Sequence, residues 1–191
     1  MYMKVRCDWV INGTPIEIQY HDYEWCVPVH DDNKLFEFLV LESAQAGLSW
    51  ATILKKRQGY RKAFDNFDVE KVANYDQRRI QQLLANPAII RNKLKIQSAV
   101  KNATAFVKLQ QELGSFDSYI WSFVDGKPKR NKWKNLSEIP SRTEISDALS
   151  KDMKKKGFVF VGPTTCYSLM QGIGMVNDHI TKCFRYKDLV Q

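Results

Sequence analysis

The chain has 191 residues, which is enough for one domain, or for two small lobes, with a hydrophobic core. Hydrophobic residues make up 44% of it and aromatic residues 12%, so the composition excludes a disordered protein, which needs an apolar-poor chain. The formal charge of +8 favours a polyanionic partner only weakly, because many basic proteins bind nothing acidic.

The sequence contains no stretch suited to crossing a membrane. Its aliphatic and aromatic runs, such as residues 38–41, are a handful of residues long, whereas a span needs roughly 20. Residues 1–10 include charges and a Trp and lack the apolar core of a signal peptide. We therefore expect a soluble, cytoplasmic protein with no membrane partner, in which cysteines are free thiols or metal ligands more often than disulfides. The cysteines are Cys7, Cys26, Cys166 and Cys183.

The N-terminal half begins with an alternating pattern and continues with a helical one. Residues 16–20 alternate between apolar and polar, which predicts a single short extended segment. Asp32 or Asn33 can cap a helix that runs to Ala46 and stops at Gly47. Because this helix is apolar on nearly all sides, it should lie in the middle of the protein.

Four further helices are predicted before the C-terminal third of the chain. Ser49 can cap a helix that ends in the basic run 55–57. Short helices are indicated at about 69–74 and 77–84, and a longer one at about 91–113, where apolar residues follow a helical stripe.

Two more helices are predicted in the C-terminal third. Ser141 and Glu144 have the spacing of a capping box in front of an apolar stripe. Pro163, which is favoured in a first turn, opens a helix that ends at Gly172 or Gly174. With one ambiguous strand against about eight helices, the predicted fold class is all-α.

Two His and two Cys residues have the chemistry of a metal site that joins the two ends of the chain. His179 and Cys183 are one helical turn apart, so a helix would place both on one face, and Cys7 and His21 lie near the opposite end. A Cys₂His₂ set has the ligand number and softness that tetrahedral zinc prefers. The alternative is a chance neighbourhood of His179 and Cys183, with Cys7 a small buried hydrophobe.

Glu42 and the aromatic residues near it in the sequence form a candidate binding site. Glu42 directly follows an apolar run, and a carboxylate kept on the apolar side of a helix end is a functional candidate, because an unpaired buried charge is costly. By pattern alone, a Glu at the helix end that turns to solvent is the more frequent case. The aromatic residues are core or the lining of a pocket for a planar or cationic ligand. They are Trp9, Tyr20, Trp25 and Trp50.

Basic residues cluster at 55–62, at 91–95 and at 127–134. A solvated face explains any one cluster, whereas several on one protein favour a surface that contacts phosphates. The stretch 157–165 contains glycines and leads into a helix, and such a turn exposes backbone N–H groups to a phosphate. A plain turn between helices is the alternative.

Taken in order, these residues form blocks that resemble a known family. The blocks are Cys7-x-Trp9, Tyr20-His21-Asp22-x-Glu24-Trp25, Leu41-Glu42-x-x-Gln45-Ala46-Gly47-Leu48-Ser49-Trp50, Ile90-Arg91-x-x-x-Lys95-Ile96, Trp121-Ser122-Phe123-Val124, Gly157-Phe158-x-Phe160-Val161-Gly162, Tyr167-x-x-Met170-Gln171 and Gly174-x-Val176-Asn177-Asp178-His179. From residue 7 to residue 183 the chain closely resembles the bacterial 3-methyladenine DNA glycosylase I family.

This resemblance implies a two-lobed, all-α helix-hairpin-helix DNA glycosylase. Residues 1–191 would form a single unit with the base pocket between two helical lobes and the hairpin near 157–175. The resemblance also implies one structural zinc ion per chain that joins the N- and C-terminal segments. Its ligands would be Cys7, His21, His179 and Cys183.

The family's base-binding Glu and stacking aromatics match Glu42 as the catalytic residue and Tyr20, Trp50 and Trp9 as substrate-binding residues. A base methylated at N3 is cationic in the nucleotide and leaves as a neutral purine, so its glycosidic bond is already weak. The implied reaction is therefore hydrolytic excision of 3-methyladenine by water after the nucleotide is flipped out. No Lys is a candidate for a Schiff base, so we expect no strand cleavage.

The implied partner is damaged double-stranded DNA, bound by a monomer. The turn 157–165 would contact the DNA backbone, with Gly162 and Thr164 at the contact, and Leu48 lies in a turn that could fill the gap left by the flipped base. Related hairpin glycosylases use an Asp after the hairpin helix; here Asp178 either has that role or caps the turn that carries His179.

Three positions depart from the family pattern. Cys26 stands where Gly is usual, Asp8 replaces a common Gly, and Ala88 stands where Gly is frequent. They affect local geometry, and Cys26 is a possible alternative thiol ligand. Two other classes stay open: a silent relative that binds damaged DNA without excising a base, and a basic structural protein with an aromatic core and no zinc.

Overall fold

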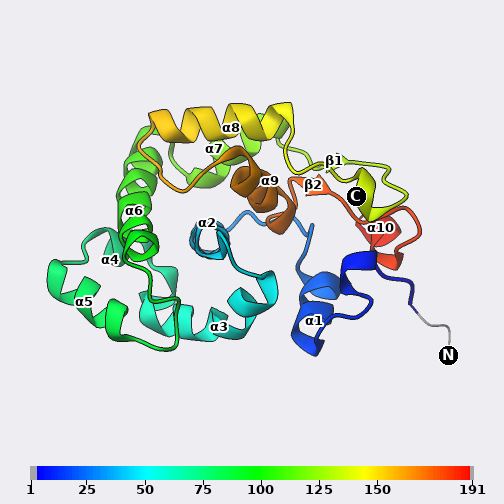
Figure 1. The fold of residues 1–191 in the computed structure, drawn as a ribbon. Helices are drawn as coiled ribbons and strands as arrows, with labels where there is room; N and C mark the ends of the chain where they lie inside the picture. The colour runs from blue at the N-terminus through cyan, green and yellow to red at the C-terminus, as the bar shows by residue number, and fades with distance from the viewer. Residues whose placement is uncertain (1–3, 190–191) are drawn as a thin grey trace.

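The computed structural model describes residues 4–189 and is mostly helical, with α2 near its centre (Figure 1). The outermost ends of the predicted 1–191 unit, residues 1–3 and 190–191, lie outside the described residues. The α-helices are α1 (Pro15–Tyr23), α2 (Asp32–Gln45), α3 (Trp50–Ala63), α4 (Val69–Ala73), α5 (Gln77–Ala85), α6 (Lys93–Leu113), α7 (Phe116–Trp121), α8 (Glu144–Lys155), α9 (Pro163–Gly172) and α10 (Phe184–Asp188).

The central position predicted for the apolar helix is confirmed. Every residue of α2 from 35 to 44 is buried, and α3, α6, α7 and α9 all contact the helix. Its cap is Asp31, one residue before the predicted pair, and the Asp31 carboxylate accepts a hydrogen bond from the backbone N–H of Lys34. Asp32 instead accepts from the first backbone N–H groups of α7, which ties the two helices together.

The extended segment predicted at residues 16–20 is wrong, because these residues belong to α1. Pro15 occupies the first turn, and Thr14 and Glu17 form a capping box in which the Glu17 carboxylate accepts from the Thr14 backbone N–H at 2.8 Å. These local start signals override a period-two pattern that is too short to decide between helix and strand.

The capping box predicted at Ser141 and Glu144 is also wrong in register. Thr143 and Ser146 form it: the Ser146 hydroxyl accepts from the Thr143 backbone N–H at 2.8 Å, and the Thr143 hydroxyl accepts from the Ser146 N–H at 3.3 Å. Helix α8 therefore begins at Glu144. The other predicted helices are confirmed to within two residues at their ends, except that α3 continues six residues past the predicted basic run and ends at Ala63.

The short elements escaped prediction. Helices α7 and α10 have no long apolar period, and two parallel two-residue strands pair Lys129 with Val176. The strands are β1 (Lys129–Arg130) and β2 (Val176–Asn177), and the 3-10 helices are Asp8–Val10, Asp65–Phe67, Ser122–Val124 and Leu136–Glu138. No helix among the described residues has the length and hydrophobicity needed to span a membrane.

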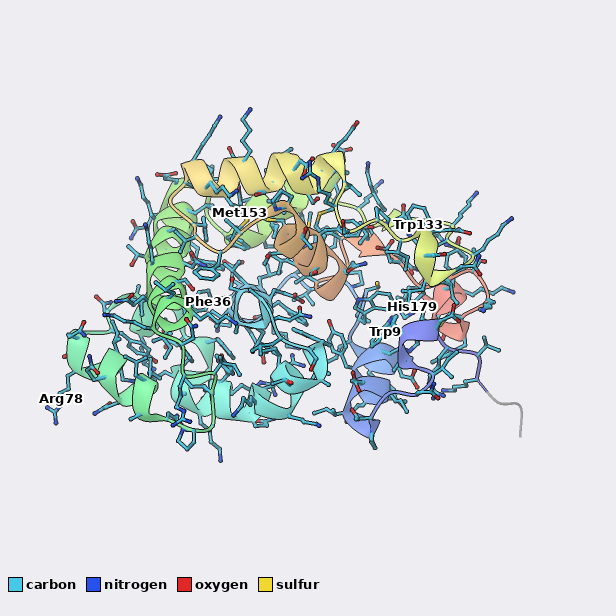
Figure 2. All side chains as sticks on the ribbon, in the orientation of Figure 1. Trp9, Phe36, Arg78, Trp133, Met153 and His179 are labelled. Atoms are coloured by element: carbon cyan, nitrogen blue, oxygen red, sulfur yellow. The ribbon has the colours of Figure 1, made fainter. Side chains whose placement is uncertain are left out.

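Segments from the two ends of the described chain meet on one side of the molecule, at α1 and α10 (Figure 1). The backbone N–H of Phe184 donates to the carbonyl of Val5 at 2.9 Å. Figure 2 shows Trp9 and His179 in this same part of the structure, far from Arg78 at the tip of α5. The fold thus brings together residues that are more than 150 positions apart in the sequence.

Candidate functional site

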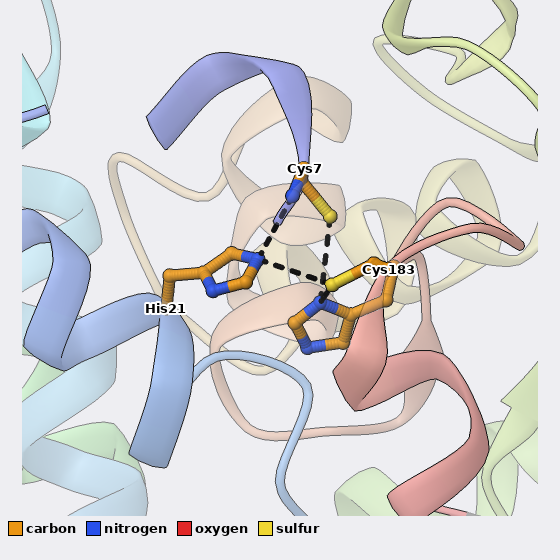
Figure 3. Close-up of side chains that lie close together, drawn as sticks. Cys7, His21 and Cys183 are labelled. Atoms are coloured by element: carbon orange, nitrogen blue, oxygen red, sulfur yellow. Dashed lines mark hydrogen bonds between the residues drawn. The ribbon is translucent and has the colours of Figure 1, made fainter. Parts of the chain in front are cut away.

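Four buried side chains from the two chain ends form a compact Cys₂His₂ cluster (Figure 3). Their ligand atoms lie within 4.8 Å of one another, and the Cys183 Sγ is 3.6 Å from the His21 Nε2 and 3.5 Å from the His179 Nδ1. Tetrahedral bonds of about 2.3 Å to sulfur and 2.0–2.1 Å to nitrogen separate neighbouring ligands by about 3.6 Å. The structure therefore brings all four predicted ligands, including Cys7, to a spacing that could hold a metal ion.

Groups around the cluster orient both imidazoles. The His21 Nδ1 lies 2.8 Å from the Asp22 carboxylate, which also pairs with the Arg6 guanidinium, and the His179 Nε2 lies 3.2 Å from the carbonyl of Trp25. These partners bind the N–H of each ring and leave the other nitrogen, as a lone pair, facing the cluster. Burial lowers the pKa of His179, which favours the neutral ring that a metal requires.

A pocket of about 320 Å³ lies among α1, α2, α3, α9 and the segment 136–141. The four residues predicted to bind or act on the base, Trp9, Tyr20, Glu42 and Trp50, all line it. The rings of Tyr20 and Trp50 are in contact, with centroids 5.2 Å apart. The pocket thus combines stacking surfaces with one acidic group.

Glu42 turns into this pocket and away from solvent. It is 5% exposed, and burial raises the pKa of its carboxyl to about 8. Within residues 4–189 no group donates a hydrogen bond to it. Its Oε1 packs against Gly172 of α9, where a Cβ would lie only 3.3 Å away. A buried carboxylate without a partner is costly, so the arrangement suits a group that meets a ligand.

The indole N–H groups of Trp9 and Trp50 are also buried and have no hydrogen-bond partner within the described residues. Buried indole N–H groups usually find an acceptor. Both indoles line the same pocket as Glu42. The pocket therefore offers the Glu42 acceptor and two indole donors to a polar, planar ligand.

The wall of the pocket formed by α9 and by residues 136–141 was missed by the residue-by-residue reasoning. Tyr167 and Gln171 line it, and in the sequence they stand out only as a block shared with the resembling family. Their spacing of four residues on a predicted helix was the available signal, since it puts both side chains on one face.

Two of the three residues predicted to contact DNA lie together beside the pocket that Glu42 lines. Leu48, 39% exposed, and Thr164 line a smaller cavity of about 200 Å³ that shares Glu42 with the first pocket. Gly162 is the N-cap residue of α9. The turn that carries Leu48 is held by Lys95, whose ammonium donates to the carbonyls of residues 44 and 46 at the end of α2.

Comparison with known proteins decides the family. A family model described as methyladenine glycosylase matches residues 9–186, nearly the whole chain. The chain belongs to the methyladenine glycosylase family. The resemblance of the sequence blocks is thereby confirmed.

Two curated members of this family cover the chain almost completely. The chain is 49% identical to DNA-3-methyladenine glycosylase 1 of Escherichia coli (strain K12), over 95% of this chain and 96% of that protein. It is 47% identical to the DNA-3-methyladenine glycosylase of Haemophilus influenzae, over 95% and 97%.

Solved structures of the family also match the fold. A crystal structure of 3-methyladenine DNA glycosylase I superposes with a TM-score of 0.91 at 50% identity, covering 94% of this chain and 98% of that one. A variant of 3-methyladenine DNA glycosylase I in complex with 3-methyladenine matches with a TM-score of 0.90 at 37% identity, covering 94% and 96%. The all-α fold class is confirmed.

Cys26, which the sequence left open as an alternative thiol ligand, stays outside the Cys₂His₂ cluster. Its φ of +63° lies in the left-handed region, where glycine is favoured, which explains why the family usually has Gly there. Its sulfur accepts the backbone N–H of Asp178 at 3.4 Å. The Cys26 sulfur is not among the four ligand atoms that lie within 4.8 Å of one another, and burial raises the pKa of its thiol.

The other two departures are accommodated locally. Asp8 forms an ion pair with Lys182 at 3.3 Å. Ala88 packs against Gly59, where any side chain would meet the Ala88 carbonyl oxygen at 2.3 Å. Neither Asp8 nor Ala88 lines the pocket that contains Glu42.

One predicted basic cluster is partly internal. Arg57 is 9% exposed, and its guanidinium donates to Glu37 at 2.8 Å and to Glu24 at 2.6 Å, while Arg61 also donates to Glu37. Two of the basic residues within 55–62 are therefore engaged in an ion-pair network inside the glycosylase. Only the lysines of that cluster can add to a phosphate-binding surface.

The buried carboxyl of Glu42 is expected to make stability depend on pH. Its pKa is about 8 in the folded protein and near 4.5 in an ordinary chain, so between these values only the unfolded state has lost the proton. The contribution of protonated Glu42 to the free energy of unfolding is therefore complete below pH 4.5. It is lost as the pH rises to 8, by about 1.4 kcal/mol per pH unit.

Glu42→Gln removes that titration. The free energy of unfolding of the variant minus that of the wild type should therefore increase with pH by this slope and become constant above pH 8. Urea unfolding of both proteins across this pH range measures the difference. A difference that stays constant with pH would show that the carboxyl is already ionised in the folded protein.

Proposed function

We propose that this protein is a DNA-3-methyladenine glycosylase that flips out and hydrolytically excises 3-methyladenine from alkylated DNA. The observation that carries the proposal is the buried Glu42, without a hydrogen-bond partner among residues 4–189, in a pocket that Tyr20 and Trp50 also line, with their rings 5.2 Å apart. The names of the family members, at about half identity over nearly the full chain, support the same activity.

The chemistry suits this pocket because the lesion is a cation. Tyr20 and Trp50 stack the charged base with a cation–π gain that a neutral adenine lacks. Glu42 is the catalytic residue: its carboxylate accepts the exocyclic N–H of the base, and the positive charge of the base offsets the cost of ionising Glu42 in an apolar site. Trp9 completes the pocket with its unpaired indole N–H.

The reaction is monofunctional hydrolysis. Water attacks C1′ of the flipped nucleotide, the bond from C1′ to N9 breaks, and its electrons neutralise the cationic base as it leaves. The attacking water loses its proton to solvent, which leaves an abasic site and an intact strand. The base leaves as a neutral molecule, so no general acid is needed, and selectivity comes partly from the lability of the bond.

For the metal, the proposal is one structural zinc ion per chain, held by the Cys₂His₂ cluster. Two thiolates and two neutral imidazoles match the charge and softness of zinc, and four protein ligands leave no open position for water. The ion would join the N- and C-terminal segments without taking part in the reaction.

The DNA-binding part of the proposal rests on α8, α9 and the turn between them as a helix-hairpin-helix element near 157–175. Asn102 holds this turn by donating to the carbonyl of Val159 and accepting from its N–H, at 3.0 and 2.8 Å. Gly162 and Thr164 at the start of α9 would meet the DNA backbone, and Leu48 would fill the gap left by the flipped base.

The wider proposal is one unit over residues 1–191 with two helical lobes around the base pocket. It acts as a monomer in the cytoplasm on damaged double-stranded DNA. Release of free 3-methyladenine from methylated duplex DNA, followed by chromatography, tests the activity. Binding of methylated DNA without release would instead identify a silent damage reader.

Binding to undamaged duplex DNA is expected to weaken steeply with salt. The net charge of +8 and the exposed clusters near residues 91–95 and 127–134 imply phosphate contacts that release counterions. Affinity should fall by about tenfold or more between low and physiological salt, as measured by fluorescence anisotropy. An affinity that stays flat over this range would show that the basic clusters do not contact DNA.

A further inference from the structure

Asp178 lies at the centre of a buried hydrogen-bond network that joins two parts of the molecule. Its Oδ1 accepts from the Asn131 amide at 2.6 Å and from the Trp133 indole at 2.7 Å. Its Oδ2 accepts from the Tyr167 hydroxyl at 2.7 Å and from the Gln171 Nε2 at 2.8 Å. Asp178 is fully buried, and Figure 2 shows Trp133 in the same region as the neighbouring His179.

These four donors occupy the accepting positions of the carboxylate. Asp178 therefore has no free lone pair with which to take a proton from an attacking water. It does not cap the turn either, because the backbone N–H of His179 is bound by the Asn177 side chain at 3.2 Å. Of the two roles left open by the sequence, the structure supports neither.

The network instead sets the direction of the groups that face the pocket. A carboxylate only accepts, so the Gln171 amide must present its nitrogen to Asp178 and turn its Oε1 the other way. The Tyr167 hydroxyl likewise gives its proton to Asp178 and can only accept on its other side. Both side chains line the base pocket, and within residues 4–189 the Gln171 Oε1 has no hydrogen-bond donor.

Glu42 belongs to the same wall. Its Oε1 packs against Gly172, the residue after Gln171 on α9, and both Glu42 and Gln171 line the pocket. Three groups on this side, from Glu42, Gln171 and Tyr167, are thus hydrogen-bond acceptors. A base that presents N–H groups to this side of the pocket can donate hydrogen bonds to these acceptors. A base that presents a carbonyl there places its own acceptor against them and forms no hydrogen bond.

We propose that Gln171 is a specificity-determining residue, whose amide oxygen, oriented by Asp178, selects alkylated adenine over alkylated guanine. Adenine carries an amino group at C6 and guanine a carbonyl at the same position. The acceptors on this side of the pocket therefore bind the amino group of adenine and disfavour the carbonyl of guanine, since buried unpaired polar groups give strong discrimination. This inference rests on the proposed function and makes Asp178 a positioning residue.

The sharpest test is Asp178→Asn, because the network determines which way the new amide turns. The Trp133 indole is a donor only, so the oxygen of the Asn side chain must stay on that side and its nitrogen must face α9. The Tyr167 hydroxyl and the Gln171 amide oxygen then accept hydrogen bonds from this nitrogen. The Tyr167 O–H and the Gln171 N–H groups are thereby free to point into the pocket as donors. The ratio of 3-methylguanine to 3-methyladenine release should rise by about tenfold.

Single-turnover release from duplex DNA that carries both lesions measures this ratio in one reaction. The ratio does not change when part of the protein is unfolded, because both lesions meet the same active fraction. Gln171→Met keeps the shape but removes the acceptor, so release of 3-methyladenine should fall while that of 3-methylguanine does not. If Asp178→Asn fails to fold, Gln171→Met decides alone.

The matched control is Asn131→Leu, which removes a donor to Asp178 on the side away from α9 and should leave the ratio unchanged. Metal content and circular dichroism are measured for each variant, because Asp178 adjoins His179. A wild-type ratio in folded Gln171→Met and Asp178→Asn proteins would overturn the inference. A wild-type protein that releases no 3-methyladenine would instead overturn the proposed function.

Discussion

Replacing Glu42 with glutamine is expected to slow the release of 3-methyladenine by roughly one to two decades while the protein stays folded. The change keeps the shape of the side chain but removes its charge and one acceptor. A charge-assisted hydrogen bond in a desolvated pocket is worth about 1.5–3 kcal/mol, which corresponds to this loss of rate. Single-turnover release from methylated DNA measures it directly.

Circular dichroism and tryptophan quenching by free base separate a functional from a structural effect in this experiment. Glu112→Gln makes the same chemical change at an exposed position of α6 and should leave both rate and quenching unchanged. Glu42→Gln should fold at least as well as the wild type at neutral pH, since it removes a buried ionisable group. Unchanged release and quenching in the folded variant would remove Glu42 from the site.

Replacing Cys183 with serine is expected to abolish metal binding and to lower the melting temperature by on the order of 10 °C. The cluster joins two segments from opposite ends of the chain, so losing the ion removes a link that the unfolded chain does not have. A loss of several kcal/mol corresponds to such a shift in a chain of this size. Elemental analysis of freshly purified protein and thermal unfolding followed by circular dichroism measure both effects.

Cys166→Ser is the matched control for this change. Cys166 is equally buried, but it lies outside the cluster and its sulfur contacts only the carbonyl of Val161 in the described hydrogen-bond network. The control should keep one metal ion per chain. Wild-type protein that contains no zinc, or a full metal load in the His179→Ala/Cys183→Ser double variant, would contradict the proposed site.

Local signals in the sequence predicted most of the helices correctly. Helix α3 begins where Ser49 accepts the backbone N–H of Thr52, and α6 begins where Asn92 accepts that of Lys95. Such caps act within one turn, so the sequence nearby contains everything needed to place them. The wrong predictions at α1 and α8 also concern local signals. At α1 the capping box overrides the alternating pattern, and at α8 the box of Thr143 and Ser146 forms in place of the predicted one.

The burial of charged groups could not be predicted from patterns. Glu42 and Glu37 lie on the same helix and both look like charged interruptions of an apolar run. Glu37 is paired with Arg57 and Arg61, whereas Glu42 has no partner among the described residues and faces the pocket. Which carboxylate is a structural ion pair and which meets a ligand depends on helices that arrive from elsewhere in the chain.

The sequence by itself determined the all-α class, the central apolar helix, the family, the four members of the Cys₂His₂ cluster and four of the residues that line the pocket, because these depend on residue types and on short-range order. Only the tertiary structure decided what these groups face. Asp178 has its role because Asn131, Trp133, Tyr167 and Gln171 converge on it from two separate segments. Hydrogen-bond direction and desolvation are properties of such three-dimensional neighbourhoods, and sequence spacing does not contain them.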